Sequence, residues 1–347
     1  MQTLWFALAA VMVAIYVVMD GFDFGAGALH LWVARGDAER RQVLGAIGPF
    51  WDGNEVWLLA AGGVLFLAFP KVLGSGLSGL YLAIMMVLWV LILRGVAIEF
   101  RSHLADALWR QFFDGAFALA STLAPVLFGA ALGNLVRGVP LQADGWFSLP
   151  LFESFSPTGA LGILDWFTVL AGLLALAALA HHGALFLAWK TDGPVRTRSL
   201  AAARRLYWVV LALWVIATVA TARLVPEIFG ALAARPLAWL ATALFLAGLV
   251  TSGLFRRRGR DLAAFVASGA FILGLLAATA ACVYPTMIRS AGDPAFSLTA
   301  LNASASEHAL ATGLRWWPFG FVIALGYLAF LFRLHRGKRR VAEDPGY

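Results

Sequence analysis

Long apolar runs recur along the chain from its first residues to about residue 333. Short polar segments, many of them rich in Arg, separate these runs. An apolar run of about 20 residues is long enough to cross the hydrocarbon core of a bilayer as a helix. The pattern therefore predicts nine membrane-spanning helices, at residues 4–33, 50–69, 77–99, 114–136, 162–189, 206–224, 237–255, 262–284 and 312–333.

Composition supports the same class of protein. Hydrophobic residues make up 61% of the 347 residues, charged residues make up 13%, and the mean hydropathy is +0.82. A soluble domain needs more polar surface than this, and a membrane β-barrel would show alternating segments of about ten residues. We expect an all-α polytopic membrane protein. The single cysteine, Cys282, excludes an internal disulfide framework and cysteine-rich zinc sites, and we expect no metal site.

The net charge of +7 comes mainly from basic residues that lie between the apolar runs. They do not form a basic patch with interleaved aromatic residues, so we expect no nucleic-acid partner. Cytoplasmic loops of membrane proteins carry an excess of Lys and Arg. That rule places the N-terminus outside and the C-terminus in the cytoplasm, because the basic residues concentrate in segments 34–49, 100–113, 190–205, 256–261 and the tail.

A faint internal repeat suggests how the helices are grouped. The segments "GFDFGAGALHLWVARGDAERR" and "AHHGALFLAWKTDGPVRTRS" both place a Gly-Ala step and a Trp before a basic loop. Four predicted helices separate them, so both run in the same direction. We expect one membrane domain with two four-helix units, 1–136 and 162–284, and a ninth helix at 312–333.

Two carboxylates interrupt the first span. Asp20 and Asp23 are three residues apart and therefore lie on one face of a helix. A charged carboxylate at the centre of a membrane helix costs about 2.5–3.5 kcal/mol on insertion scales, so such residues face protein and are candidates for function. Gly21, Gly25 and Gly27 remove side chains from this region and allow another helix to approach closely.

The second span opens with a similar pair. Asp52 and Glu55 are again three residues apart in "WDGNEVWL", with Asn54 and Trp57 beside them. No cation lies within the first two spans, so four carboxyls would share the cytoplasmic half of one helix pair. Such a ladder outlines a proton path. Helix capping is the competing interpretation, above all for Asp52.

Other polar residues in the spans have weaker patterns. Arg94, Glu99 and Arg101 favour an interfacial ion-pair network, with docking of a partner as the alternative. His181 and His182 could provide a haem ligand or only hydrogen bonds within the bundle. Two further acids, Asp114 and Asp165, stand at predicted helix starts and are expected to be caps.

The ordered motifs resemble those of subunit II of cytochrome bd-type quinol oxidases, including the cyanide-insensitive branch. They span most of the chain: "DGFDFGAG" (20–27), "WDGNEVWL" (51–58), "RGVAIEFRS" (94–102), "GNLVRGVP" (133–140), "HGALFLAWKT" (182–191) and "DPAFSLTALNASAS" (293–306). The resemblance implies two four-helix bundles plus one peripheral helix. It also implies a bacterial inner-membrane heterodimer with a subunit I that carries two b-type haems and one d-type haem.

The resemblance further implies an activity and roles for residues. Such a complex oxidises quinol and reduces oxygen to water, taking protons from the cytoplasm. The acid of the W-D-G-N stretch, here Asp52, belongs to the family's proton path. Small accessory subunits and a structural quinone occur in some members. Around the candidate acids Asp20, Asp23, Asp52 and Glu55, the supporting residues are expected to be Asn54, Trp57, Arg94, Glu99, Arg101 and His182.

Two departures and one alternative stay open at the level of sequence. Some relatives have an amide where this chain has Glu55, and "HHG" at 181–183 is not shared by all branches. A secondary transporter is the alternative function, because buried carboxylates and a parallel repeat suit that class as well. A transporter should have broken helices near the midplane of both halves, whereas the buried acids here concentrate in the first two spans.

Overall fold

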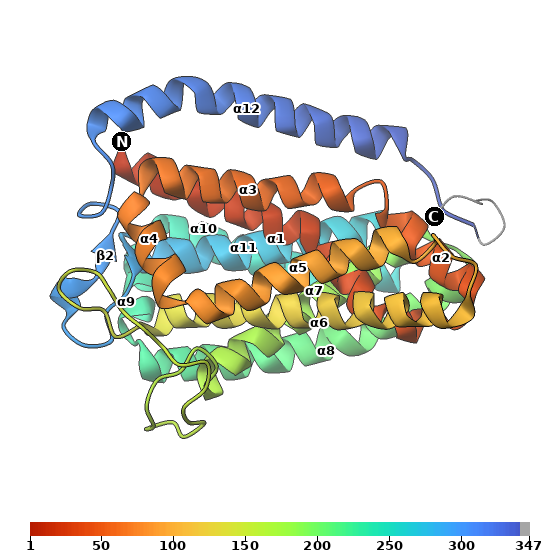
Figure 1. The fold of residues 1–347 in the computed structure, drawn as a ribbon, viewed down its shortest axis with the longest axis horizontal. Helices are drawn as coiled ribbons and strands as arrows, with labels where there is room; N and C mark the ends of the chain where they lie inside the picture. The colour runs from red at the N-terminus through yellow and green to blue at the C-terminus, as the bar shows by residue number, and fades with distance from the viewer. Residues whose placement is uncertain (341–347) are drawn as a thin grey trace.

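The computed structural model describes residues 1–340 and is built almost wholly from helices that run along one common axis (Figure 1). The helices are α1 (Gln2–Val33), α2 (Asp37–Ile47), α3 (Trp51–Ala68), α4 (Pro70–Gly79), α5 (Tyr81–Phe100), α6 (Ala107–Arg137), α7 (Trp166–Lys190), α8 (Gly193–Leu224), α9 (Glu227–Ala234), α10 (Pro236–Arg257), α11 (Asp261–Val283) and α12 (Glu307–Leu334). Two short antiparallel strands, β1 (Thr286–Ile288) and β2 (Leu298–Thr299), flank a 3-10 turn at Pro294–Phe296.

The prediction of an all-α polytopic membrane protein is confirmed. Within the described residues, eight helices are long and apolar enough to cross a membrane on their own. The region predicted as the second span is α3, which meets α4 at an angle of 119°. Pro70 begins α4, and the residue before a proline is disfavoured in helical conformation, so the chain turns at Phe69. A ninth span requires α3 and α4 to count as one, and the number nine stays a prediction.

Of the two acids expected to cap helices, one does so and the other does not. Asp165 caps α7 as expected, because its side chain accepts hydrogen bonds from the backbone of Phe167 and Thr168. The expectation for Asp114 is wrong. Asp106 caps α6 instead, so the helix begins seven residues earlier than predicted and Asp114 lies inside it, 1% exposed. The helix extends beyond its apolar part into the more polar segment before residue 114, which hydropathy alone assigned to a loop.

Close contact between α1 and α7 joins the first predicted four-helix unit to the second. A methyl group at Gly25 would lie 1.9 Å from the backbone oxygen of Leu179, and one at Gly183 would lie 2.4 Å from the Gly25 backbone. The backbones therefore touch where the helices cross, as small residues permit in membrane bundles. The inference that the glycines near Asp20 allow close approach is confirmed. The division into two units itself stays a prediction.

The helix α12 lies along α3 at the edge of the bundle (Figure 1). Trp57 of α3 is 2% exposed and packs edge-on against Phe321 of α12, with 5.8 Å between the ring centres. Its ring therefore fastens the peripheral helix. Figure 1 also places Met1 and the end of α12 at opposite ends of the bundle, as an odd number of crossings requires.

The glycine contact leads to a prediction about stability. Gly183→Ala should lower the midpoint of thermal unfolding of the detergent-purified protein, because overpacking costs about 1–3 kcal/mol or more when backbone atoms must move. Gly115→Ala is the matched control, since a methyl group there meets no atom within 4 Å. Equal midpoints for the two variants would show that the α1–α7 contact is not tight.

Candidate functional site

A buried ion pair lies between α1 and α5. Arg94 donates two hydrogen bonds to Asp20, with Nη1 2.6 Å from Oδ1 and Nη2 3.0 Å from Oδ2. Both side chains are fully buried. The guanidinium also stacks over Phe24, 4.1 Å from the centre of the ring. Two parallel hydrogen bonds give this pair a fixed geometry as well as charge neutrality.

Glu55 joins the same arginine from α3. Its Oε1 lies 2.5 Å from Arg94 Nη2, and its side chain is 30% exposed. The expectation that no cation neutralises the carboxyls holds for α1 and α3 themselves but not for the site, because α5 supplies Arg94. The cluster therefore reaches from a fully buried acid, Asp20, to an acid at the surface of the chain.

Asp23 has a different environment from Asp20. Its Oδ2 accepts a hydrogen bond of 2.7 Å from Asn54, which also donates to the backbone oxygen of Met19. Its other oxygen is buried and has no hydrogen-bond partner within residues 1–340. One guanidinium thus bonds two carboxyls, Asp20 and Glu55, and a third, Asp23, is held by Asn54 in the same largely buried site.

Asp52 lies at the surface of the chain, in the first turn of α3. Its side chain makes no capping hydrogen bond, because the N-cap position of α3 is Phe50 and has no side-chain cap. The capping interpretation for Asp52 is therefore not supported. Asp52 shares an exposed face of α3 with Val56 and Leu59.

The expected ion-pair network at 94–101 holds for Arg101 but is wrong for Arg94 and Glu99. Arg94 joins the buried cluster, Glu99 is exposed, and Arg101 pairs with Asp114 and Asp37. Arg94 and Arg101 lie on one side of the helix but two turns apart, and Glu99 points to another side, so residues close in sequence have separate surroundings. Side-chain direction, not spacing alone, decides the partners.

The two adjacent histidines are both buried between helices. His182 uses both ring nitrogens: Nδ1 lies 2.7 Å from Ser268 Oγ, and Nε2 lies 3.1 Å from the backbone oxygen of Val18. His181 Nδ1 lies 3.0 Å from the backbone oxygen of Ala203. His182 therefore has no nitrogen left for a haem iron in this arrangement and bonds helices α1, α7 and α11 together.

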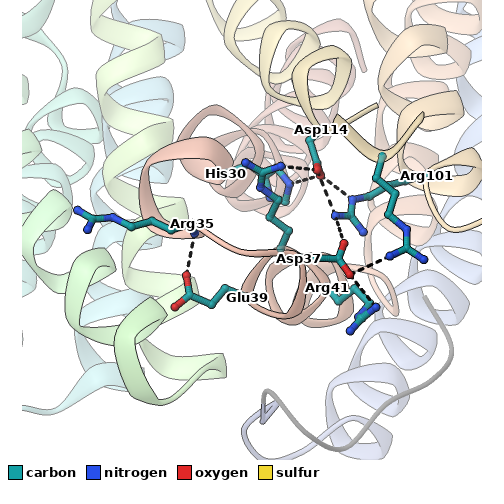
Figure 2. Close-up of polar contacts among 9 residues, drawn as sticks. His30, Arg35, Asp37, Glu39, Arg41, Arg101 and Asp114 are labelled. Carbon is teal, nitrogen blue, oxygen red and sulfur yellow. Dashed lines mark hydrogen bonds and ion pairs between the residues drawn. The ribbon is translucent and has the colours of Figure 1, made fainter. Parts of the chain in front are cut away.

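A second polar network, which the sequence analysis did not foresee, closes the end of the bundle that holds α2 (Figure 2). Asp114 accepts hydrogen bonds from Arg101 at 2.6 Å and Arg40 at 2.9 Å and lies 2.7 Å from His30 Nε2. Asp37 bridges Arg101, Arg110 and Arg41. The sequence contains one sign of a polar site here. His30 is a further polar residue of the first predicted span, seven residues after Asp23 and on the same helical face.

Another ion pair ties α2 to α8. Arg198 donates to both carboxylate oxygens of Glu39, at 2.8 and 2.9 Å, and to the backbone oxygen of Val33 at 2.5 Å. The hydrogen bonds from Arg198 lower the pKa of Glu39 from 4.5 to about 2. This pair fixes the loop that follows α1.

No group of three or more His, Cys, Asp or Glu side chains within residues 1–340 could hold a metal ion. The chemistry available to the buried cluster is therefore that of acids, amides and one guanidinium.

Comparison with known proteins assigns the chain to a family. The family model described as cytochrome bd terminal oxidase subunit II matches residues 1–335. The chain belongs to this family. The cytochrome bd ubiquinol oxidase subunit 2 of Bacillus subtilis is 30% identical over 313 residues, which cover 89% of this chain and 88% of the relative.

Two other relatives have matches of different extent. The cytochrome bd-I ubiquinol oxidase subunit 2 of Escherichia coli strain K12 is 35% identical over 219 residues, 63% of this chain and 56% of the relative. The match thus spans little more than half of that protein. A probable cytochrome oxidase subunit 2 of Haemophilus influenzae is 28% identical over 352 residues, 94% of this chain and 92% of the relative.

A solved structure supports the fold. A chain of the bd oxidase from Geobacillus thermodenitrificans superposes with a TM-score of 0.73 over 96% of this chain and 98% of that chain, at 19% identity. At this identity the likeness shows a shared fold. The resemblance of the sequence motifs to the cytochrome bd subunit II family is confirmed.

The buried Arg94–Asp20 pair leads to a prediction about the stability of the folded protein. Arg94→Gln should destabilise the folded protein by about 3–5 kcal/mol, because it leaves Asp20 buried without its cation. The double variant Arg94→Gln/Asp20→Asn should recover part of that loss, and Arg223→Gln, at an exposed arginine, should lose little. Thermal unfolding of the protein extracted from membranes measures all three. A double variant no more stable than Arg94→Gln would contradict pairing as the cause.

The Glu39–Arg198 pair leads to a prediction about pH. A carboxyl whose pKa is lowered on folding stabilises the fold above its unfolded pKa, and that stability is lost as pH falls toward the folded pKa. Glu39→Gln should therefore lower stability by about 1 kcal/mol near pH 7. The difference from the unsubstituted protein should shrink between pH 4.5 and about 2. Unfolding midpoints across that range test this, with the exposed Glu153→Gln as control. A constant difference would exclude the ion pair as its source.

Proposed function

We propose that the chain is subunit II of a complex that oxidises quinol and reduces oxygen to water. The match of the cytochrome bd terminal oxidase subunit II family to residues 1–335 carries this proposal. The relatives from Bacillus subtilis and Escherichia coli are named as ubiquinol oxidase subunits, and the former aligns over most of both chains.

The proposed partner is a haem-bearing subunit I, which this chain stabilises. One exposed face of α3 combines Asp52 with large apolar side chains, Val56 at 51% and Leu59 at 75% exposure, and Glu55 adjoins it. Carboxylates are costly against lipid, whereas a protein partner can supply donors for them. This face is therefore a good candidate for the contact with subunit I. Small accessory subunits are proposed as further partners, and the remaining exposed apolar surface would contact the lipid bilayer.

The proposed redox centres, two b-type haems and one d-type haem, lie in subunit I. The occupied nitrogens of His182 support this assignment, because they leave that side chain unsuited to ligate iron. This chain would then contribute protons and packing, while its partner contributes electron transfer.

Asp52 and Glu55 are proposed to take up protons from the cytoplasm. Asp52 is exposed and Glu55 is 30% exposed, and both stand at the start of α3. Behind them, Arg94 fixes Glu55 and Asp20 while Asn54 fixes Asp23. Since Arg94 bonds Asp20 and Glu55 while Asp23 bonds Asn54, Glu55 and Asp23 can exchange protons without breaking the buried Arg94–Asp20 pair. Asp20 and Asp23 form the inner part of this proposed path.

The other supporting residues would act through position. Trp57 holds α3 against α12, Arg101 holds α5 against α6, and His182 joins α7 to α1 and α11. Glu99 is exposed at the end of α5 and could collect protons at the surface.

The family and the apolar helices indicate an inner-membrane protein. We propose that the end of the bundle with α2 and the basic loops faces the cytoplasm, in accordance with the charge rule. The N-terminus would then lie outside. A secondary transporter is disfavoured, because the one sharply bent helix pair within residues 1–340, α3 with α4, occurs only in the first half of the chain.

The proton path leads to a prediction about turnover. In the purified oxidase complex, Asp52→Asn and Glu55→Gln should each lower quinol oxidation by about tenfold or more, because each removes a group that exchanges protons. Haem content, measured by the reduced-minus-oxidised spectrum, should stay near the unsubstituted level. Glu153→Gln, which neutralises an exposed acid in the loop before α7, is the control and should keep full turnover.

The outcomes separate the two parts of the proposal. Full turnover in a well-assembled Asp52→Asn complex would remove Asp52 from the proton path. Loss of haem together with turnover would instead assign the residue to assembly. Isolation of the unsubstituted chain without a haem-bearing partner would contradict the proposed complex itself.

A further inference from the structure

A cavity of about 450 Å³ opens among the C-terminal end of α1, the start of α2 and the first turns of α6. Its volume lies in the usual range for pockets that bind small ligands, about 300–1,000 Å³. Among its lining residues are Leu31, Asp37, Arg40, Arg101, Arg110 and Asp114. Five of these six side chains are charged, which makes the cavity unlike the apolar spaces between membrane helices.

Positive charge exceeds negative charge around the cavity. Asp114 pairs with Arg40 and Arg101, while Asp37 pairs with Arg41, Arg101 and Arg110. This ion-pair network holds four guanidiniums, of which Arg41 does not line the cavity, against two carboxylates, so an excess of two positive charges remains when His30 is neutral. Arg35 also borders the cavity, but its guanidinium points away from Asp114 (Figure 2). An anion would balance the excess.

Donors for such an anion are present on three of the arginines. Nε of Arg40, Nη1 of Arg101 and Nε of Arg110 are buried and have no hydrogen-bond partner within residues 1–340. Arg101 is the most enclosed, with only 2% of its side chain exposed. Buried donors are normally paired. These three therefore indicate an acceptor that is not among the described residues.

The surface beside the cavity is apolar. Leu108 and Phe112, one turn apart on α6, are 76% and 63% exposed, and Trp32 at the end of α1 is 78% exposed. Leu31 itself lines the cavity and is 43% exposed. A ligand with a charged head and apolar chains would contact both kinds of surface.

We propose that this cavity binds a phosphate group at the membrane surface. Guanidiniums match phosphate oxygens in charge and geometry, and basic pockets between membrane helices bind the headgroups of anionic lipids. The phosphate comes from an anionic phospholipid or from free phosphate, and the exposed Leu108 and Phe112 favour the lipid. Arg40, Arg101 and Arg110 are the binding residues. The site is separate from the Asp20–Arg94 cluster and does not depend on the proposed oxidase activity.

Binding can be measured on the intact complex purified from membranes and freed of lipid in dodecyl maltoside. Three probes separate the sources: phosphatidylglycerol, inorganic phosphate, and monogalactosyl diacylglycerol, which has acyl chains but no phosphate. Native mass spectrometry counts retained lipid, and equilibrium dialysis with radiolabelled phosphate measures the free anion. The unsubstituted complex should retain phosphatidylglycerol or phosphate, and the glycolipid should not displace either one.

The variants are Arg110→Gln and Arg40→Gln. Each leaves both carboxylates paired, since Asp37 keeps Arg41 and Arg101 while Asp114 keeps Arg101 and His30. Each should weaken binding about tenfold, the effect of losing one charge-assisted hydrogen bond. Arg257→Gln removes an exposed charge from the end of α10 and should bind as the unsubstituted complex does.

The outcomes decide both the site and the source of the phosphate. Loss of phosphatidylglycerol in the variants supports a lipid site, and loss of inorganic phosphate alone supports a free-anion site. Equal binding in the variants and the unsubstituted complex, or no binding of either probe, overturns the proposal. If the variants do not fold, protection of Arg40 and Arg110 from phenylglyoxal by phosphatidylglycerol or phosphate in the unsubstituted complex replaces them, and absence of protection has the same meaning.

Discussion

The packing of α1, α3 and α5 depends on one buried guanidinium. Arg94 has no exposed surface and bonds Asp20 and Glu55 while it stacks on Phe24. A buried charge is tolerated only when its partners are fixed, so these three helices must keep one relative position for the pair to persist. The acids that make α1 and α3 unusual as membrane helices are thus also the groups that align them with α5.

The sequence predicts the helices well, because each apolar run is long and the bilayer sets its length. It also predicts the close approach near Gly25, since glycine leaves room for a neighbouring backbone. It does not predict the partners of the charged side chains. Arg94 bonds an acid 74 residues away, whereas Glu99, five residues later, faces outward. Such pairing depends on helix rotation and packing, which hydrophobic patterns constrain only weakly.

The error at Asp114 has a similar origin. The segment before it is polar, so its hydropathy suggests a loop, yet Asp106 caps a helix that continues into the membrane. As a result Asp114 lies seven residues after the first residue of α6, Ala107, where Arg101, Arg40 and His30 can reach it. Asp20 and Asp114 are both buried acids neutralised by an arginine, Asp20 by Arg94 within α5 and Asp114 by Arg101 directly after it.

Contact between the backbones of Gly25 and Gly183 restricts motion of α1 against α7. Helices that meet through side chains can slide as rotamers change, but helices that meet through main-chain atoms have no such freedom. Sliding of α1 along α7 at this crossing therefore requires the two backbones to separate first. The crossing therefore acts as a fixed point between α1 and α7.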